Sequence, residues 1–202
     1  MASQIENGNW KIYNKIGKTL LYKFLFGWGL QQYKFNQLEV KKFITLENSI
    51  NITDIQNSLA SIYFGKELIN IPSSDMGPDN FEKSFVDFAN YHNASFKLIK
   101  NPKIKENFPL IYAVGKGSLE EPRLLELNWG NKNYPLVVLI GKGVCFDTGG
   151  HDLKPSQYMR NMKKDMGGAA SILSLAHMLI ESKLKVRIKV LIPTVNNDIG
   201  PA

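Results

Sequence analysis

Two largely apolar runs constrain the fold of this chain more than any other feature. They cover residues 136–140 and 186–192, and an Ala- and Leu-rich segment at about 168–182 lies between them. Near-continuously apolar runs are typical of strands buried on both faces of a sheet, with helices as their connections. The pattern predicts an α/β fold, an α/β/α sandwich around a mixed, largely parallel sheet.

Elsewhere, apolar spacing and turn residues predict three further helices and several strands. The helices are expected at residues 10–30, from Thr53 onwards, and after Asp79 as a capping residue. The last strand is expected to end at Pro193. The chain stops soon after it, which predicts a sheet with an open edge. The remaining expected strands are 41–46, 95–99, 110–114 and 123–129.

Composition limits the classes of protein to consider. The 202 residues allow one full domain, or one domain and part of another. The net charge of +7 comes from lysines spread along the chain, which favours a solvated basic surface over a nucleic-acid partner. Cys145 is the only cysteine, so no intrachain disulfide can form, in keeping with a cytoplasmic location. No signal peptide is recognisable and the apolar run 20–30 is too short to span a bilayer, so no membrane partner is expected.

Most residues suited to chemistry lie in the glycine-rich stretch 141–168, after the first apolar run. It contains Lys142, Asp147, Lys154 and Asp165. The simplest interpretation is a salt bridge of a lysine with these aspartates. The alternative is that the aspartates hold a divalent metal, with one lysine as a neutral ligand and the other charged to stabilise an oxyanion. From residue types and spacing, both interpretations remain open.

Other interpretations of these residues are weaker. The stretch lacks the P-loop pattern, and the single Asp147-Thr-Gly run is insufficient for an aspartic protease. Cys145 is expected to be a buried strand residue rather than a nucleophile. His151 is a candidate ligand that a solvated loop histidine would equally explain. His92 and His177 fall in helical segments and are expected to be structural.

The stretch resembles the catalytic blocks of the leucyl (cytosol) aminopeptidase family in residue type and spacing. The resemblance covers residues 66–202 strongly and 1–65 weakly. The blocks are Gly141-Lys-Gly-Val-Cys-Phe-Asp-Thr-Gly-Gly150, Leu153-Lys-Pro-Ser156 and Met162-Lys-Lys-Asp-Met-Gly-Gly-Ala-Ala170, with further agreement at 66–78, 113–117, 122–127 and 192–197.

The resemblance implies a role for each site residue. Lys142, through its amine, and Asp165 would bind one metal of a two-metal centre, and Asp147 would bridge both metals. Lys154 would be the catalytic lysine, and Met162 would line the pocket for the first side chain of the substrate. The metals would be zinc or manganese, and the reaction would release N-terminal, leucine-like residues from peptides.

The resemblance also has implications for the whole chain. Family members are homohexamers, so a homo-oligomer is expected if the protein is complete. Residues 1–65 would be the remnant of an N-terminal α/β domain, and residues 66–202 the N-terminal part of the catalytic domain.

The sequence departs from the family where the rest of the metal centre is expected. The block Asn-Thr-Asp-Ala-Glu-Gly-Arg, which supplies two further acidic ligands and an arginine, is absent. His151 stands where an aliphatic residue is usual. These departures predict one weakly bound metal and little or no turnover by this chain alone. The missing block would then come from a complementary C-terminal fragment, or the chain would be a non-catalytic truncated relative that acts as a binding or assembly piece.

Overall fold

The structure, a computed structural model, describes residues 6–12, 16–36, 42–45 and 52–200. The chain divides into two compact units, residues 1–63 and 64–202, and the boundary falls within one long helix, α2 (Thr53–Asn70). Each unit is described by itself. In the described part of the chain, no helix is both long and apolar enough to cross a membrane.

The first unit is an α/β region, as predicted. Strands β1 (Gly8–Lys11) and β2 (Lys42–Thr45) pair in parallel, with helix α1 (Lys18–Leu30) between them in the chain. Helix α1 begins later than predicted, because the segment around Trp10 is extended in β1 and Gly17 is the N-cap. The end of α1 packs on α2, where a Cβ atom on Gly29 would overlap Leu59 and where the Tyr63 hydroxyl donates a hydrogen bond to the Gly29 carbonyl.

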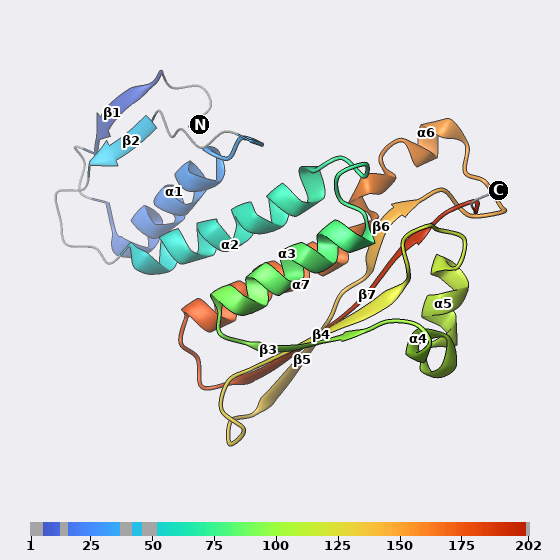
Figure 1. Cartoon of the computed structure of the whole chain (residues 1–202). Helices are drawn as coiled ribbons and strands as arrows, with labels where there is room; N and C mark the ends of the chain where they lie inside the picture. Colours follow the sequence, from blue (N-terminus) through green and yellow to red (C-terminus); the bar gives the residue numbers. More distant parts are fainter. Residues whose placement is uncertain (1–5, 13–15, 37–41, 46–51, 201–202) are drawn as a thin grey trace. The chain divides into compact units, whose positions relative to one another are not determined.

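The second unit is built on a five-stranded mixed sheet, which confirms the predicted fold class (Figure 1). Strand β4 (Arg123–Trp129) is antiparallel to both β3 (Ser95–Ile99) and β7 (Arg187–Asn197). Strands β5 (Leu136–Ile140) and β6 (Gly143–Asp147) pair in parallel with the other side of β7. The parallel pairings therefore lie on one side of β7 only. The sheet is mixed, as predicted, but fewer of its strand pairings are parallel than the sequence suggested.

Helices lie on both faces of this sheet. Helices α3 (Pro78–Tyr91) and α7 (Gly167–Glu181), with the end of α2, form the main core with residues such as Leu125 and Val190. Leu124 and Leu191 alternate with those residues and face the opposite side, where they pack with the short helices α4 (Lys103–Asn107) and α5 (Pro109–Gly115). Figure 1 shows α7 behind α3, and α4 with α5 at one end of the sheet.

Two local predictions in this unit were wrong. Residues 110–114, expected as a strand, form helix α5, which begins with Pro109 at its first position, where the missing N–H has no helical partner to lose. Asp79 does not cap α3, because Gly77 is the N-cap. Its carboxylate instead binds Arg123 at 2.5 Å.

The last strand also differs from prediction, because β7 continues through Pro193 to Asn197. Ile140 pairs with Leu191 and Gly143 with Thr194, so Pro193 faces the break between β5 and β6, where no ladder hydrogen bond is required from it. β7 is thus an interior strand. The open edges of the described sheet belong to β3 and to β5 with β6.

Candidate metal centre

The centre begins at the turn between β5 and β6, against which the start of α7 docks. The Ala169 amide donates to the Lys142 carbonyl at 2.9 Å, and the Gly141 amide donates to the Leu191 carbonyl at 3.1 Å. A Cβ atom on Gly141 would lie 2.7 Å from the Cα atom of Ala169, so only glycine permits this approach. The turn thus places Lys142 beside the segment that carries Asp165.

Lys142 and Asp165 form the first of two ion pairs. The Lys142 Nζ atom lies 2.8 Å from Oδ1 and 2.7 Å from Oδ2 of Asp165. Asp165 belongs to the 3₁₀ helix η2 (Met162–Met166), which packs against β6. Lys142 is exposed, whereas the Asp165 side chain is largely buried, and the Lys142 amine contacts both of its carboxylate oxygens.

Asp147 and Lys154 form the second pair, at the carboxyl end of β6. The Lys154 Nζ atom contacts Asp147 Oδ2, and Asp147 Oδ1 accepts hydrogen bonds from the Gly149 amide at 2.9 Å and from Asn197 Nδ2 at 2.7 Å. Burial alone would raise the pKa of Asp147. The hydrogen bonds from Lys154, Gly149 and Asn197 outweigh burial, so the pKa lies below its ordinary value and the carboxylate is ionised at neutral pH.

The turn after β6 returns the chain so that Lys154 meets Asp147. The Lys154 amide donates to the Thr148 carbonyl at 2.9 Å, and the Thr148 hydroxyl donates to the Asn197 carbonyl at 2.8 Å. Gly149 has a φ of +95°, and a Cβ atom there would lie 2.3 Å from the Asp152 carbonyl oxygen. The glycine is therefore required by both the backbone conformation and the space.

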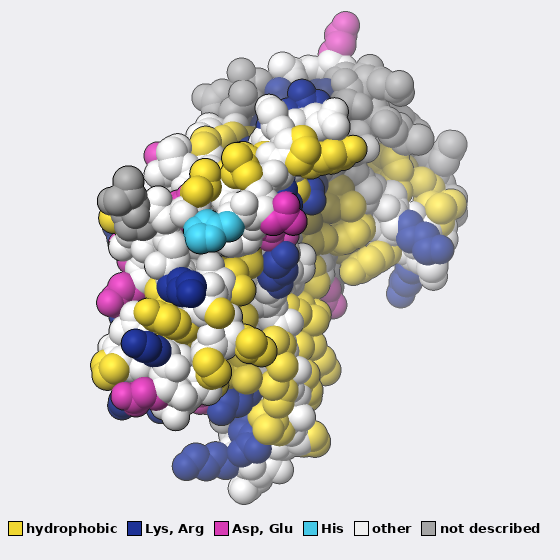
Figure 2. Space-filling view, turned by 90° about the vertical axis from the view of Figure 1, so that its right-hand side faces the viewer, with side chains coloured by type: hydrophobic (Ala, Val, Ile, Leu, Met, Phe, Trp, Pro, Cys, Tyr) yellow, Lys and Arg dark blue, Asp and Glu magenta, His cyan; other side chains and the backbone are white. Residues whose placement is uncertain are grey.

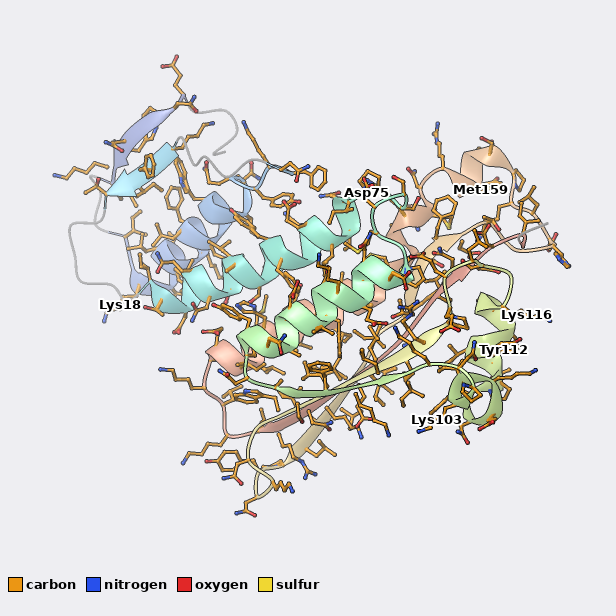
Figure 3. The ribbon with its side chains drawn as sticks, in the orientation of Figure 1. Lys18, Asp75, Lys103, Tyr112, Lys116 and Met159 are labelled. Atoms are coloured by element: carbon orange, nitrogen blue, oxygen red, sulfur yellow. The ribbon has the colours of Figure 1, made fainter. Side chains whose placement is uncertain are left out.

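Met162 opens η2, is half-buried and lies in the same segment as Asp165. The neighbouring Lys163 anchors this segment by donating from Nζ to the Asn70 carbonyl at the end of α2, at 2.8 Å. Figure 3 labels Asp75, in the turn after α2, and Met159, at the end of helix α6 (Ser156–Met159). The stretch 141–168 is therefore held against the end of α2 as well as against the sheet.

Asn197 is the site residue that sequence reasoning missed. It lies at the carboxyl end of β7 and pairs with Asp147 in the β6–β7 ladder, so both its backbone and its side chain position the 147–148 segment. The sequence could have indicated Asn197 through its place at the end of an apolar strand. The carboxyl ends of parallel strands lie at one edge of a sheet, so a polar residue there is expected close to Asp147.

Cys145 and His151, two further candidates from the stretch 141–168, differ in exposure. Cys145 is 1% exposed, and burial, with Glu120 nearby, raises the pKa of its thiol to about 12, which excludes a thiolate nucleophile at neutral pH. His151 lies exposed in the loop after Gly150.

The donor set of the two pairs suits a divalent cation. Asp147 and Asp165 offer hard carboxylate oxygens from partly buried positions, and Lys142 offers a nitrogen once its amine has lost a proton to the incoming cation. Three side chains alone leave the coordination of a two-metal centre incomplete. The residues present therefore fit one metal better than two.

Comparison with known proteins gives a consistent result. Residues 63–202 match the model of the cytosol aminopeptidase family, catalytic domain. Peptidase B of Yersinia pestis is 35% identical over 156 residues, which are 73% of this chain and 36% of that protein.

Solved structures agree. The crystal structure of cytosol aminopeptidase from Coxiella burnetii superposes with a TM-score of 0.90 at 35% identity, over 98% of this chain and 44% of that one. The bottromycin maturation enzyme BotP in complex with Mn has a TM-score of 0.78 at 25% identity, over 88% of this chain and 40% of its own.

The chain thus spans less than half the length of the relatives it matches. Its match to the family model nevertheless covers most of its residues, including every predicted site residue. The family predicted from the motifs is confirmed, and this chain belongs to the cytosol aminopeptidase family.

Proposed function

We propose that this chain supplies one half of a two-metal aminopeptidase centre that releases N-terminal, leucine-like residues from peptides. One observation carries the proposal: two lysine–aspartate pairs, Lys142–Asp165 and Lys154–Asp147, lie at the β5–β6 turn and at the carboxyl end of β6, beside η2. The family match over residues 63–202 supports peptidase chemistry at this position.

In this proposal Lys142, Asp147 and Asp165 hold the metal. Manganese or zinc would supply Lewis-acid polarisation of the scissile carbonyl and a water molecule that is a nucleophile at neutral pH. Manganese has a precedent in the BotP complex. The Asn197 amide and the Gly149 N–H fix the orientation of Asp147, so the carboxylate is preorganised before any cation arrives.

Lys154 is the proposed electrophile. Its ammonium lies on Asp147, at the edge of the ligand set, where positive charge can stabilise the oxyanion that forms when the carbonyl is attacked. Met162, from the same segment as Asp165, is proposed to line the pocket for the first side chain of the peptide.

The sheet supports the proposal that a complementary chain completes the centre. Leu136, Val138 and Ile140 project from one face of β5 and are 46%, 46% and 67% exposed. Figure 2 shows hydrophobic side chains gathered over the lower part of the face it draws, with Lys and Arg side chains interspersed. We propose that the rest of the catalytic domain covers β5 and supplies the further acidic ligands and arginine, because this chain spans less than half of the length of its relatives.

Three further aspects of the proposal follow from family membership. Residues 1–65 are assigned to a remnant N-terminal domain and residues 66–202 to the catalytic domain. The assembled protein is proposed to be a homo-oligomer, a hexamer as in the family. Its location is proposed to be cytoplasmic, in keeping with the name of the Coxiella burnetii structure.

Metal binding tests the ligand assignment directly. In titrations of the purified chain with Mn²⁺ followed by electron paramagnetic resonance, we expect one weak site, and at least about tenfold weaker binding in Asp147→Asn and Asp165→Asn. Asp152→Asn is the matched control, because Asp152 is exposed in the same loop. Equal loss in the control, or undiminished binding in both ligand variants, would refute the assignment.

Turnover tests the catalytic assignment. With Mn²⁺ and leucine-p-nitroanilide, we expect little or no hydrolysis by the chain alone and hydrolysis when a chain with the missing block is supplied. Lys154→Ala should abolish that activity while leaving Mn²⁺ binding in place. Full activity of Lys154→Ala would exclude its role, and Lys154-dependent turnover by the isolated chain would show that no second chain is needed.

A second candidate function is a non-catalytic binding or assembly piece. The exposed apolar face of β5 favours it, because such a face is an association surface whether or not chemistry follows. A complementary chain that binds but leaves leucine-p-nitroanilide unhydrolysed would support this alternative.

A further inference from the structure

A second group of ligand-type side chains lies away from the candidate metal centre. His92, His177 and Glu181 each offer one ligand atom, and these atoms lie within 4.8 Å of one another. The sequence had predicted both histidines to be structural. None of the three belongs to the stretch 141–168 or to the proposed peptidase chemistry.

The helices hold this group in a fixed frame. His177 and Glu181 are four residues apart on α7, so their side chains lie on the same face of that helix. His92 is the C-cap of α3, with its amide bonded to the Phe88 carbonyl. Phe88 and Ala176 belong to the core that packs α3 and α7 on the same face of the sheet.

The His92 side chain is the most constrained of the three. It is 2% exposed, and its Nε2 atom has no hydrogen-bond partner among the described residues. Its Nδ1 atom lies 3.8 Å from Glu181 Oε1, beyond hydrogen-bond range. A buried imidazole nitrogen without a partner is costly, and this imidazole faces the Glu181 carboxylate without a hydrogen bond between them, so a cation held by both groups would stabilise the arrangement.

The environment favours the form of histidine that binds metals. Burial, with His177 nearby, lowers the pKa of His92, and burial lowers the pKa of His177, while Glu181 opposes both shifts. Neutral imidazoles beside a carboxylate form a ligand set with the chemistry of a zinc site.

We propose that His92, His177 and Glu181 form a zinc site that joins α3 to α7, separate from the peptidase centre. Ligand atoms around tetrahedral zinc lie about 3.3 Å apart, given Zn–N and Zn–O distances near 2.0–2.1 Å. Glu181, which is 31% exposed, is the ligand free to move inward by a rotamer change. A hollow adjoins His177, so water can reach this side of the group; its lining residues are Phe64, Ser84, Asp87, Phe88, Tyr91 and His177.

The ring contacts supply the competing explanation. His92 and His177 pack edge to face with centroids 4.9 Å apart, and Phe88 and Tyr91 contact both rings. If these contacts were the whole role of the group, zinc would not bind there. Replacing Glu181 would then change neither zinc uptake nor the response of the melting temperature to zinc, because its carboxylate takes no part in the ring packing.

The test uses the full chain with Asp147→Asn and Asp165→Asn, so that the peptidase centre does not contribute. In equilibrium dialysis with Zn²⁺, we expect one zinc per chain and a rise in the melting temperature. Co²⁺ in its place should give visible ligand-field absorption typical of low coordination. The further change Glu181→Gln, or His177→Gln, should weaken zinc binding at least tenfold and remove the rise in melting temperature.

Asp87→Asn is the matched control, since it removes one carboxylate from the adjoining hollow without touching the three ligands. It should bind zinc as the parent does. The proposal is overturned if the parent takes up no zinc, if Glu181→Gln binds as tightly as the parent, or if Asp87→Asn loses zinc to the same extent. Glu181→Gln is the deciding variant. Glu181 is partly exposed, so its replacement disturbs folding less than replacement of the buried His92 would.

Discussion

At the scale of single residues, Arg123 shows how the second unit accommodates a buried charge. Its side chain is 2% exposed, with Nη2 at 2.5 Å from Asp79 Oδ1 and Nη1 at 2.6 Å from Glu82 Oε2. Its Nε atom donates to the Glu121 carbonyl at 2.9 Å. Burial lowers the pKa of the guanidinium, but Glu82 and Asp79 outweigh burial and raise it. The charge therefore persists and ties α3 to β4.

Replacing this cation should be costly. Arg123→Met would leave Glu82 largely buried with Lys100, at 2.8 Å, as its remaining cation, so we expect a loss of about 3 kcal/mol in the free energy of unfolding. Lys189→Met is the matched control, because its pair with Glu126 is more exposed, and it should cost about 1 kcal/mol or less. Equal losses in urea denaturation would contradict this account.

Cys145 gives a second prediction at the same scale. Because its pKa is raised to about 12, above the value of about 8.5 for an unfolded thiol, its contribution to stability is present at neutral pH and is lost as pH rises toward 12. Iodoacetamide at pH 8 should label the thiol only when the chain is unfolded. The alkaline loss of stability should be smaller in Cys145→Ala. Rapid labelling of the native chain would show that the thiol is not buried.

At the scale of elements, the approach of α7 to the β5–β6 turn positions half of the candidate centre. The contact is between backbones. A Cβ atom added to Gly141 would lie only 2.7 Å from the Cα atom of Ala169 and 2.9 Å from the carbonyl oxygen of Gly168. Neither backbone atom can give way without moving α7. The site thus depends on glycine at a position that carries no chemistry.

We therefore expect Gly141→Ala to cost about 1–3 kcal/mol of stability and to weaken Mn²⁺ binding, since Lys142 and Asp165 would separate. Gly167→Ala is the control at the start of α7, where a Cβ would make an ordinary 3.7 Å contact with Ile69, so it should be neutral or stabilising. Thermal unfolding of the two variants distinguishes them. A similar effect of both would mean that chain flexibility, rather than close packing, makes glycine necessary.

Elements also show where sequence reasoning reached its limits. The strands at 123–129 and 136–140 were predicted with their observed bounds, because apolar, β-branched composition is a local signal. Residues 110–114 have similar composition but form a helix, since they pack on Leu124 and Leu191 at the end of the sheet rather than pairing within it. Local sequence does not encode that difference.

At the scale of the whole molecule, the described sheet of the second unit has an unpaired edge at β5, and one face of this strand is apolar and exposed. Leu136, Val138 and Ile140 lie at alternate positions of one strand and form a continuous apolar row. An exposed row of this kind promotes association between chains.

We expect the isolated chain to bind a hydrophobic fluorescent dye or to aggregate, and Val138→Lys with Ile140→Lys to reduce both. Leu184→Lys is the control, because Leu184 is half exposed but lies in the turn before β7. A native monomer that melts in one sharp transition without binding dye would contradict the inference.

The sequence by itself determined the family, the fold class and the side chains available at the candidate centre, because these are carried by short contiguous motifs and by local apolar patterns. Only the tertiary structure decided that β7 is interior, that Asn197 orients Asp147, and that His92 meets His177 and Glu181. Each of these depends on contacts between segments far apart in the chain. Strand order and helix docking, which create such contacts, minimise the free energy of the whole unit rather than of any one stretch.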